Sequence, residues 1–462
     1  MIDRSTNDQS DENSGKFREM EIENKIGSYQ IEELHKELDY LKRRLALVPE
    51  PVQWCCKHIQ QFWWTVSSLA GLGWLHNGAR PVAQNTSSEP TIQIPTIQPA
   101  EMPVPRLFLD VTVTCKSKLN TGVQRVIREL CRYGESGGEL APVLIENGHF
   151  VTLPNLIPLR FQQGDKILLL DSGWTHTEMY PPALARARQE GADIILGIYD
   201  LIPVQYPGFV HPYFTSIFEN WLKTVTPFCK TALTISRYSA DSFKNWTKKQ
   251  GLYSSIQEIG WFHLGANFPA LDNVQQSNFR KRKTIPDSFV LSVGTIEPRK
   301  GYSCALDAFD ILWSEGSSLC YVIIGRKGDL ASHVIDRIIN HPQFEKKLFW
   351  PQDVGDQDLA NYYKLSTCVL IPALAEGFGL PLIEANFYGK PVIASNLQVF
   401  VEVAPKGVKF FEATRSDKLV EAIKELSLQT DLPAQGLPTL DWQLATNNMI
   451  EIVKSSKYQI KY

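Results

Sequence analysis

Short apolar runs alternate along this chain with longer segments in which apolar residues recur every three or four positions. The short runs predict strands covered on both faces, and the longer segments predict amphipathic helices. The predicted strands lie at residues 106–112, 166–171, 192–200, 231–235, 289–295, 320–325 and 369–372. Strands that alternate with helices in this way indicate an α/β protein with doubly wound, mainly parallel sheets.

The pattern also divides the chain into segments of different character. At 462 residues, a chain is long enough for two to four domains with buried cores. The predicted segments are a polar tail with a short coiled-coil-like helix (1–50), an amphipathic aromatic helix (51–80), a Pro/Ser/Thr linker (81–105), a first α/β domain (106–284), a second α/β domain (285–440) and a final helix (441–462).

Two segments before the α/β domains each allow two interpretations. Leucines and isoleucines at heptad spacing over residues 31–48 favour self-association or, equally, a helix that packs on its own protein. Trp and Phe residues on the amphipathic face of residues 52–75 suit contact with a membrane surface. The same face could instead cover a groove on the α/β domains, so both interpretations stay open.

Composition narrows the class of protein. Hydrophobic residues make up 43% and charged residues 21% of the chain, as in a soluble globular protein. A net charge of −3 provides no basic surface for nucleic acid, and we exclude that partner. The eight cysteines form no CxxC pair, which favours a reducing cytosol and argues against zinc. We recognise neither a signal peptide nor a membrane-spanning run, and therefore expect a cytoplasmic protein.

The most informative stretch is residues 376–384, Glu-Gly-Phe-Gly-Leu-Pro-Leu-Ile-Glu, which we call the signature segment. This segment predicts a glycine turn between a buried strand and a helix that ends at Gly389. Pro381 suits the first helical turn, where its missing N–H has no cost. Two glutamates thus bracket a helix N-terminus, a place where backbone N–H groups attract anions and polar ligands.

Two glutamates at this spacing alone would usually be solvated side chains. Together with the intervening Gly-Phe-Gly-Leu-Pro, however, the segment resembles family 4 of the retaining glycosyltransferases, also described as glycosyl transferases group 1. That family has the GT-B fold, in which two Rossmann-like domains face a cleft. The resemblance covers residues 106–455 and is strongest over 289–405.

Three further motifs carry the resemblance. Thr-Gly-Val-Gln-Arg at 121–125 resembles the glycine loop that closes the first domain over the donor. The turn that ends in Arg299 and Lys300 resembles the basic turn that holds the donor diphosphate, although Thr295 stands where many relatives have arginine. Tyr-Asp-Leu-Ile-Pro at 199–203 resembles a segment that begins with histidine in many relatives.

The resemblance assigns roles to individual residues. It implies that Glu376 contacts the donor sugar, that Arg299 and Lys300 stabilise the departing diphosphate, and that Glu384 binds the ribose hydroxyls. The implied further donor-binding residues are Phe378, Gly379, Leu380, Gly122, Thr295, Gly325 and Val354, and the acceptor candidates are Asp200, Tyr199 and Arg237. No DxD-type carboxylate cluster accompanies them, so we expect no essential metal and no cofactor apart from the nucleotide sugar.

The resemblance implies a retaining hexosyltransferase whose first domain binds the acceptor and whose second domain binds the donor. We expect mannose or rhamnose, with GDP-mannose favoured, to pass to a growing surface glycan or lipid-linked saccharide, as in O-antigen and capsule assembly. The expected location is the cytoplasm, peripheral on the inner face of the plasma membrane. An inactive GT-B scaffold and another GT-B sugar-nucleotide enzyme, such as an epimerase, are the alternatives.

Overall fold

The computed structural model describes residues 105–117, 121–267, 279, 286–428 and 440–461. The predicted helices within 1–80 and the linker up to residue 104 lie outside the described residues. None of the helices in the described part of the chain combines the length and the apolar character that a membrane span requires.

An eight-stranded sheet forms the centre of the first lobe, in the order β14-β7-β6-β5-β4-β1-β2-β3. Its strands are β1 (Leu107–Asp110), β2 (Ala141–Glu146), β3 (His149–Thr152), β4 (Lys166–Leu169), β5 (Asp193–Ile198), β6 (Thr231–Thr234), β7 (Glu258–Trp261) and β14 (Ile460–Lys461). All neighbouring strands are parallel except at the two edges, where β3 and β14 run antiparallel to β2 and β7.

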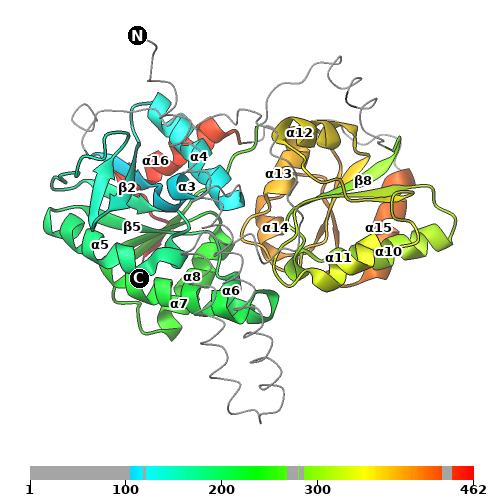
Figure 1. Cartoon of the computed structure of the whole chain (residues 1–462), viewed down its shortest axis with the longest axis horizontal. Helices are drawn as coiled ribbons and strands as arrows, with labels where there is room; N and C mark the ends of the chain where they lie inside the picture. Colours follow the sequence, from blue (N-terminus) through cyan, green and yellow to red (C-terminus); the bar gives the residue numbers. More distant parts are fainter. Residues whose placement is uncertain (1–104, 118–120, 268–278, 280–285, 429–439, 462) are drawn as a thin grey trace, which may run out of the picture. The chain divides into compact units, whose positions relative to one another are not determined.

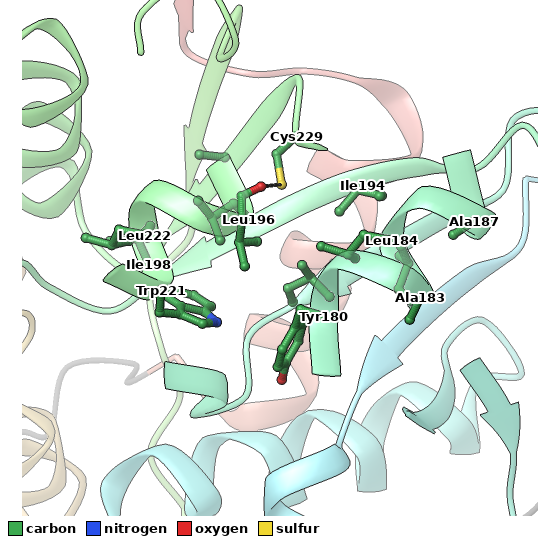
Figure 2. Close-up of a cluster of buried hydrophobic side chains, with 14 of the residues drawn as sticks. Tyr180, Ala183, Leu184, Ala187, Ile194, Leu196, Ile198, Trp221, Leu222 and Cys229 are labelled. Atoms are coloured by element: carbon green, nitrogen blue, oxygen red, sulfur yellow. Dashed lines mark hydrogen bonds between the residues drawn. The ribbon is translucent and has the colours of Figure 1, made fainter. Parts of the chain in front are cut away.

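Helices pack on both faces of this sheet because its central strands are apolar on both sides. The α-helices of this lobe are α3 (Thr112–Lys116), α4 (Gly122–Ser136), α5 (Tyr180–Gln189), α6 (Ile202–Gln205), α7 (Pro212–Val225), α8 (Arg237–Lys249) and α16 (Trp442–Ser455). Figure 2 shows Leu184 of α5 and Trp221 of α7 in one buried cluster with Leu196 of β5.

The last helix, α16, belongs to the first lobe although it follows the second lobe in the sequence (Figure 1). Asp441 caps its N-terminus by accepting a hydrogen bond from the Leu444 N–H at 2.7 Å, and Trp442 is fully buried. The Lys166 ammonium on β4 donates to the Val453 carbonyl near the other end, at 2.7 Å. The final helix therefore packs on the first lobe, mainly against α4.

The second lobe contains a six-stranded sheet in which every neighbouring pair is parallel. Its order is β10-β9-β8-β11-β12-β13, with β8 (Phe289–Val293), β9 (Cys320–Ile324), β10 (Leu348–Phe349), β11 (Cys368–Ile371), β12 (Val392–Ser395) and β13 (Lys409–Phe411). Its α-helices are α10 (Tyr302–Ser314), α11 (Ser332–Ile339), α12 (Asp356–Leu365), α13 (Leu380–Phe387), α14 (Gln398–Val403) and α15 (Ser416–Leu428). Two doubly wound lobes confirm the predicted α/β class.

One local expectation is corrected, and one hairpin appears that was not predicted. The strand predicted over 106–112 ends at Asp110, because the Asp110 carboxylate accepts the Thr112 N–H at 3.1 Å and turns the chain into α3. In the second lobe, α12 begins at Asp356, and Gly355 occupies its cap position. The antiparallel hairpin β2–β3 was not predicted, although its Asn147-Gly148 turn, with φ values of 50° and 72°, is the turn that such hairpins favour.

Candidate active site

The candidate site lies where three neighbouring strands of the second sheet end. β9, β8 and β11 are adjacent and parallel, so the loops that follow them emerge at the same edge. Open α/β sheets bind their ligands at this carboxyl edge. The loop after β8 carries Arg299 and Lys300, the loop after β11 carries Glu376, and Gly325 directly follows β9.

An ion cluster joins two of these loops. Arg299 donates from Nη1 to Oε2 of Glu376 at 3.1 Å, and Lys300 donates from Nζ to Oε1 of the same carboxylate. The other side of the guanidinium contacts Glu297, with 2.8 Å between Arg299 Nε and Glu297 Oε2. The backbone adds a further link, because the Leu374 N–H donates to the Arg299 carbonyl at 2.7 Å. The three predicted catalytic residues are therefore brought together.

Electrostatics keep this cluster ionised. Burial raises the pKa of Glu376, but the charges of Lys300 and Arg299 outweigh that effect and leave the pKa below its ordinary value. Burial lowers the pKa of Arg299, whereas Glu376, Glu297 and Asp200 together raise it above its ordinary value. A preorganised, charged site of this kind can stabilise charge that develops during a reaction.

The glycine after Glu376 brings the signature segment against the first lobe. A Cβ atom on Gly377 would lie 2.6 Å from the Tyr199 carbonyl oxygen and 2.8 Å from Cβ of Asp200. Ser236 donates from its hydroxyl to the Gly377 carbonyl at 2.8 Å. Only glycine fits this approach without a shift of the backbone, and it places the acceptor candidate Asp200 next to the ion cluster.

Asp200 is a carboxylate close to the ion cluster. Burial raises the pKa of its carboxyl group, and nearby Arg299 partly offsets this. The Ile202 N–H donates to Oδ1 at 3.0 Å. Asp200, Arg299 and Glu297 line a cavity of 270 Å³ together with aromatic side chains of the first lobe, namely Trp174, Tyr199, Phe209, Phe214, Phe218 and Trp221. The cavity thus combines charged groups with apolar rings.

The second glutamate of the signature segment is almost completely buried. Glu384 is 2% exposed and accepts a hydrogen bond from the Tyr363 hydroxyl at 2.5 Å. It also accepts one from Nη1 of Arg125, at 2.5 Å, from α4 of the first lobe. Neither Arg125 nor Tyr363 was among the predicted site residues. Arg125 belongs to a motif that the sequence did reveal, whereas Tyr363 carries no sequence signal beyond its place in a helix.

The other predicted residues near the signature segment differ in exposure. Phe378 is 3% exposed, and its ring lies 5.7 Å from the ring of His263. Gly379 has a φ of 106° and precedes Leu380, the first residue of α13. Gly122 is exposed at the start of α4. Their roles in donor binding stay predictions.

The remaining predicted residues lie around the same edge or farther from it. Thr295 and Val354 are both half-buried, and Val354 packs against the core of the second lobe. Gly325 approaches the backbone of Gly294 so closely that a Cβ atom would lie 1.9 Å from the Gly294 carbonyl oxygen. Arg237 has a largely exposed side chain, and its Nε atom lies 3.7 Å from the Asp241 carboxylate. Its ion-pair partner is therefore Asp241 and not Glu376 of the ion cluster.

Cavity size alone does not mark the site. A larger cavity, of 680 Å³, is lined by residues that follow β7 and by residues of α13 and α16, and includes neither Glu376 nor Glu384. Among the described residues, no cluster of three or more His, Cys, Asp or Glu side chains could hold a metal ion. The expected independence from metal stays a prediction.

A buried carboxylate pair lies at the carboxyl ends of β1 and β4. Tyr180 donates from its hydroxyl to Asp110 at 2.8 Å, and the Thr114 N–H donates to Asp171 at 2.7 Å. Burial and the neighbouring negative charge of Asp171 raise the pKa of Asp110 from 3.8 to about 7. The pKa of Asp110 is thus higher in the folded than in the unfolded chain. The carboxyl group of Asp110 therefore contributes fully to stability below pH 4, where it is protonated, and this contribution is lost as the pH rises through 7.

Asp110→Asn is therefore expected to gain stability relative to the wild type as the pH rises. The relative gain in free energy of unfolding between pH 5.5 and pH 8 should be about 2 kcal/mol, since one pKa unit corresponds to ~1.4 kcal/mol. Urea titrations at both pH values measure it, and Asp193→Asn, at an exposed position that begins β5, is the control. A difference between Asp110→Asn and wild type that is the same at both pH values would contradict the prediction.

Comparison with known proteins identifies similar sequences that include the residues of the ion cluster. Residues 275–435 match the family model described as glycosyl transferases group 1. The chain is 28% identical over 350 residues to the serotype-specific mannosyltransferase WbdA of Escherichia coli, covering 69% of this chain and 41% of WbdA. It is 25% identical over 236 residues to the O-antigen chain mannosyltransferase RfbU of Salmonella typhimurium, covering 51% of this chain and 61% of RfbU. The chain thus spans about two fifths of the length of WbdA.

Solved structures resemble the fold. Anabaena HepE, in complex with UDP and glucose, matches with a TM-score of 0.52 and 14% identity over 76% of this chain and 98% of HepE. WaaG, a glycosyltransferase involved in lipopolysaccharide biosynthesis, matches with a TM-score of 0.53 and 12% identity over 75% of this chain and 99% of WaaG. At these identities the likeness concerns the fold alone, and that fold is GT-B, as expected.

Proposed function

Because this chain is a group 1 glycosyltransferase with the GT-B fold, we propose that it transfers a hexose from a nucleotide diphosphate sugar with retention of anomeric configuration. The proposed sugar is mannose, supplied as GDP-mannose, with rhamnose as the second choice. The proposed acceptor is a growing surface glycan or a lipid-linked saccharide. The mannosyltransferases WbdA and RfbU, to which the chain is similar, support this choice of sugar.

The observation that carries the proposal is the ion cluster of Glu376, Arg299 and Lys300 at the carboxyl edge of the second sheet. As the bond to the anomeric carbon breaks, negative charge grows on the departing diphosphate. A guanidinium can bind phosphate oxygens in a fork, and an ammonium acts as a compact point charge. Arg299 and Lys300 supply both kinds of cation, and we therefore propose that no metal ion is required.

The carboxylate of the cluster has a complementary role. Positive charge develops on the sugar ring in the transition state, and an ionised Glu376 would stabilise it. The lowered pKa of Glu376 keeps this group charged at neutral pH. Its two cationic partners also fix its orientation, which removes the cost of reorganising the site during the reaction.

The acceptor must lose a proton as it attacks. We propose that Asp200, in the cavity that Arg299 also lines, orients the acceptor hydroxyl, while a phosphate oxygen of the leaving group helps to take the proton. Aromatic rings of this cavity would pack against the apolar face of a sugar. Water has to be excluded from the site during this step, because the donor would otherwise be hydrolysed.

A panel of UDP-, GDP- and dTDP-sugars tests the proposal, with donor hydrolysis and thermal stabilisation as readouts. GDP-mannose is expected to stabilise the protein and to be hydrolysed slowly, at a rate that EDTA does not change. With an acceptor present, NMR of the product should show the anomeric configuration of the donor. If no donor stabilises the protein, the enzyme proposal fails and an inactive scaffold becomes the better explanation.

If a donor binds without turnover or transfer, the activity is overturned while the binding site stands. Loss of activity in EDTA that is restored by a divalent metal would contradict the proposed metal independence. An inverted product would contradict retention alone. These outcomes separate the finer parts of the proposal from one another.

A further inference from the structure

An ion pair joins the two lobes at Glu384, the residue proposed to bind the donor ribose. Arg125 lies in the first turns of α4 in the first lobe, and Glu384 lies on α13 in the second, 259 positions later in the chain. Their side chains are 2.5 Å apart from Nη1 to Oε1. The side chain of Glu384 is 3% exposed and that of Arg125 is 23% exposed. Such a pair is well shielded from solvent.

A ribose hydroxyl could reach Glu384 only if one of the neighbouring groups moved. Both carboxylate oxygens already accept a hydrogen bond at 2.5 Å, Oε1 from Arg125 and Oε2 from the Tyr363 hydroxyl. With so little of the carboxylate exposed, no open face is left for a further donor. Ribose binding therefore requires that Arg125 or Tyr363 give way.

The two partners differ in their freedom to move. Tyr363 is fully buried and belongs to the core of the second lobe, where its ring stacks on that of Tyr388 at 5.5 Å. Arg125 is the more exposed partner and has a long, flexible side chain. Burial lowers the pKa of Arg125, but Glu384 and, to a smaller extent, the exposed Asp356 carboxylate raise it above its ordinary value, so Asp356 is a second negative charge that acts on this guanidinium.

From this asymmetry we infer that Arg125 is a displaceable latch, which holds Glu384 across the two lobes and must release it before a donor ribose can bind. The inference rests on the proposed function, since it takes Glu384 as the ribose ligand. Arg125 is then a positioning residue rather than a catalytic one. Its ion pair opposes ribose binding, so that part of the donor's affinity is used to open the contact between the lobes.

The measurement is the ratio of two dissociation constants, that of a 2′,3′-dideoxynucleoside diphosphate to that of the parent nucleoside diphosphate. The probes are GDP and UDP, each with its dideoxy analogue. This ratio isolates the ribose hydroxyls, because the base and the diphosphate are the same in both ligands. Glu384→Gln is expected to bring the ratio close to one, which establishes that the ratio reports the contact with Glu384.

In Arg125→Gln the ratio is expected to increase by on the order of tenfold, because the ribose hydroxyls no longer compete with a charge-assisted hydrogen bond to Glu384; a tenfold change corresponds to ~1.4 kcal/mol. Arg125→Lys, which keeps the charge with fewer donors, should give an intermediate ratio. Arg128→Gln removes the same charge one turn later on α4 and is the matched control.

The outcomes separate this inference from the function on which it rests. If neither GDP nor UDP binds to the wild type, the proposed function is overturned and the latch with it. If the wild type binds but the ratio in Arg125→Gln is unchanged or lower, Arg125 orients Glu384 instead of blocking it, and the latch alone is overturned. Should Arg125→Gln fail to fold, the ratio in Arg125→Lys decides between the same two results.

Discussion

Replacing Glu376 with glutamine is expected to lower the kcat of sugar transfer by about 10²- to 10³-fold, the range found when one preorganised electrostatic group is removed from an active site. Glutamine keeps the size of the side chain and an oxygen that can accept hydrogen bonds from Arg299 and Lys300. It removes the negative charge that would stabilise the sugar ring and that holds the two cations in place. Initial rates at saturating donor and acceptor measure the effect.

Glu297→Gln is the matched control for this prediction. Glu297 contacts the same guanidinium, at 2.8 Å from Nε of Arg299, and Glu297→Gln removes one negative charge just as Glu376→Gln does. If the loss in Glu376→Gln arises only from a less well compensated Arg299, both variants should lose activity equally. We expect Glu297→Gln to lose less than about tenfold, because a partly exposed ion pair contributes only ~1 kcal/mol or less. A Glu376→Gln enzyme with most of its activity would overturn the assigned role of this carboxylate.

The sequence predicted those parts of the site that depend on local order along the chain. The glycines and Pro381 of the signature segment identify a strand, a turn and a helix, and the strand order of a parallel sheet places such turns at one edge. The resemblance then implied that Glu376, Arg299 and Lys300 act in catalysis, and the structure brings them together. Local sequence, topology and the resemblance were all needed for this part.

Contacts between distant segments could not be predicted in the same way. Nothing near Glu384 indicates that Arg125, from the other lobe, donates to it. The pairing of Asp110 with Asp171 depends on β1 and β4 being neighbours, which follows from strand order and not from either segment. Such contacts arise from tertiary packing, and a single sequence contains no direct record of which surfaces meet.

The β2–β3 hairpin has a strong local signal, whereas the edge strand β14 has almost none. Asn147-Gly148 is a strong hairpin turn, and its two flanking segments do pair as β2 and β3. β14 has only two residues, Ile460 and Lys461, and pairs with β7 at the edge of the sheet. A strand of two residues has no periodicity from which to predict it, because alternation needs four or more positions.

Gly301 ties the basic turn to the loop that leads to Glu376, and its substitution by alanine is expected to be strongly destabilising. The residue has a φ of 70°, and a Cβ atom would lie 1.8 Å from the Pro372 carbonyl oxygen. A left-handed conformation costs a non-glycine residue ~1–2 kcal/mol, and the clash with backbone requires a further shift of the loop. We expect the free energy of unfolding to fall by about 3–5 kcal/mol, measured by urea titration.

Two other glycines separate these contributions. Gly316 has a φ of 91°, and no atom lies within 4 Å of the position that a Cβ would occupy, so Gly316→Ala should show the conformational cost alone, ~1–2 kcal/mol. Gly122 also has open space and begins a helix, so Gly122→Ala should change stability by less than ~1 kcal/mol. If Gly301→Ala were no worse than Gly316→Ala, the loop at Pro372 would have to yield easily. The ion cluster would then not depend on a rigid contact between its two loops, because the link from Leu374 to Arg299 would shift with the same loop.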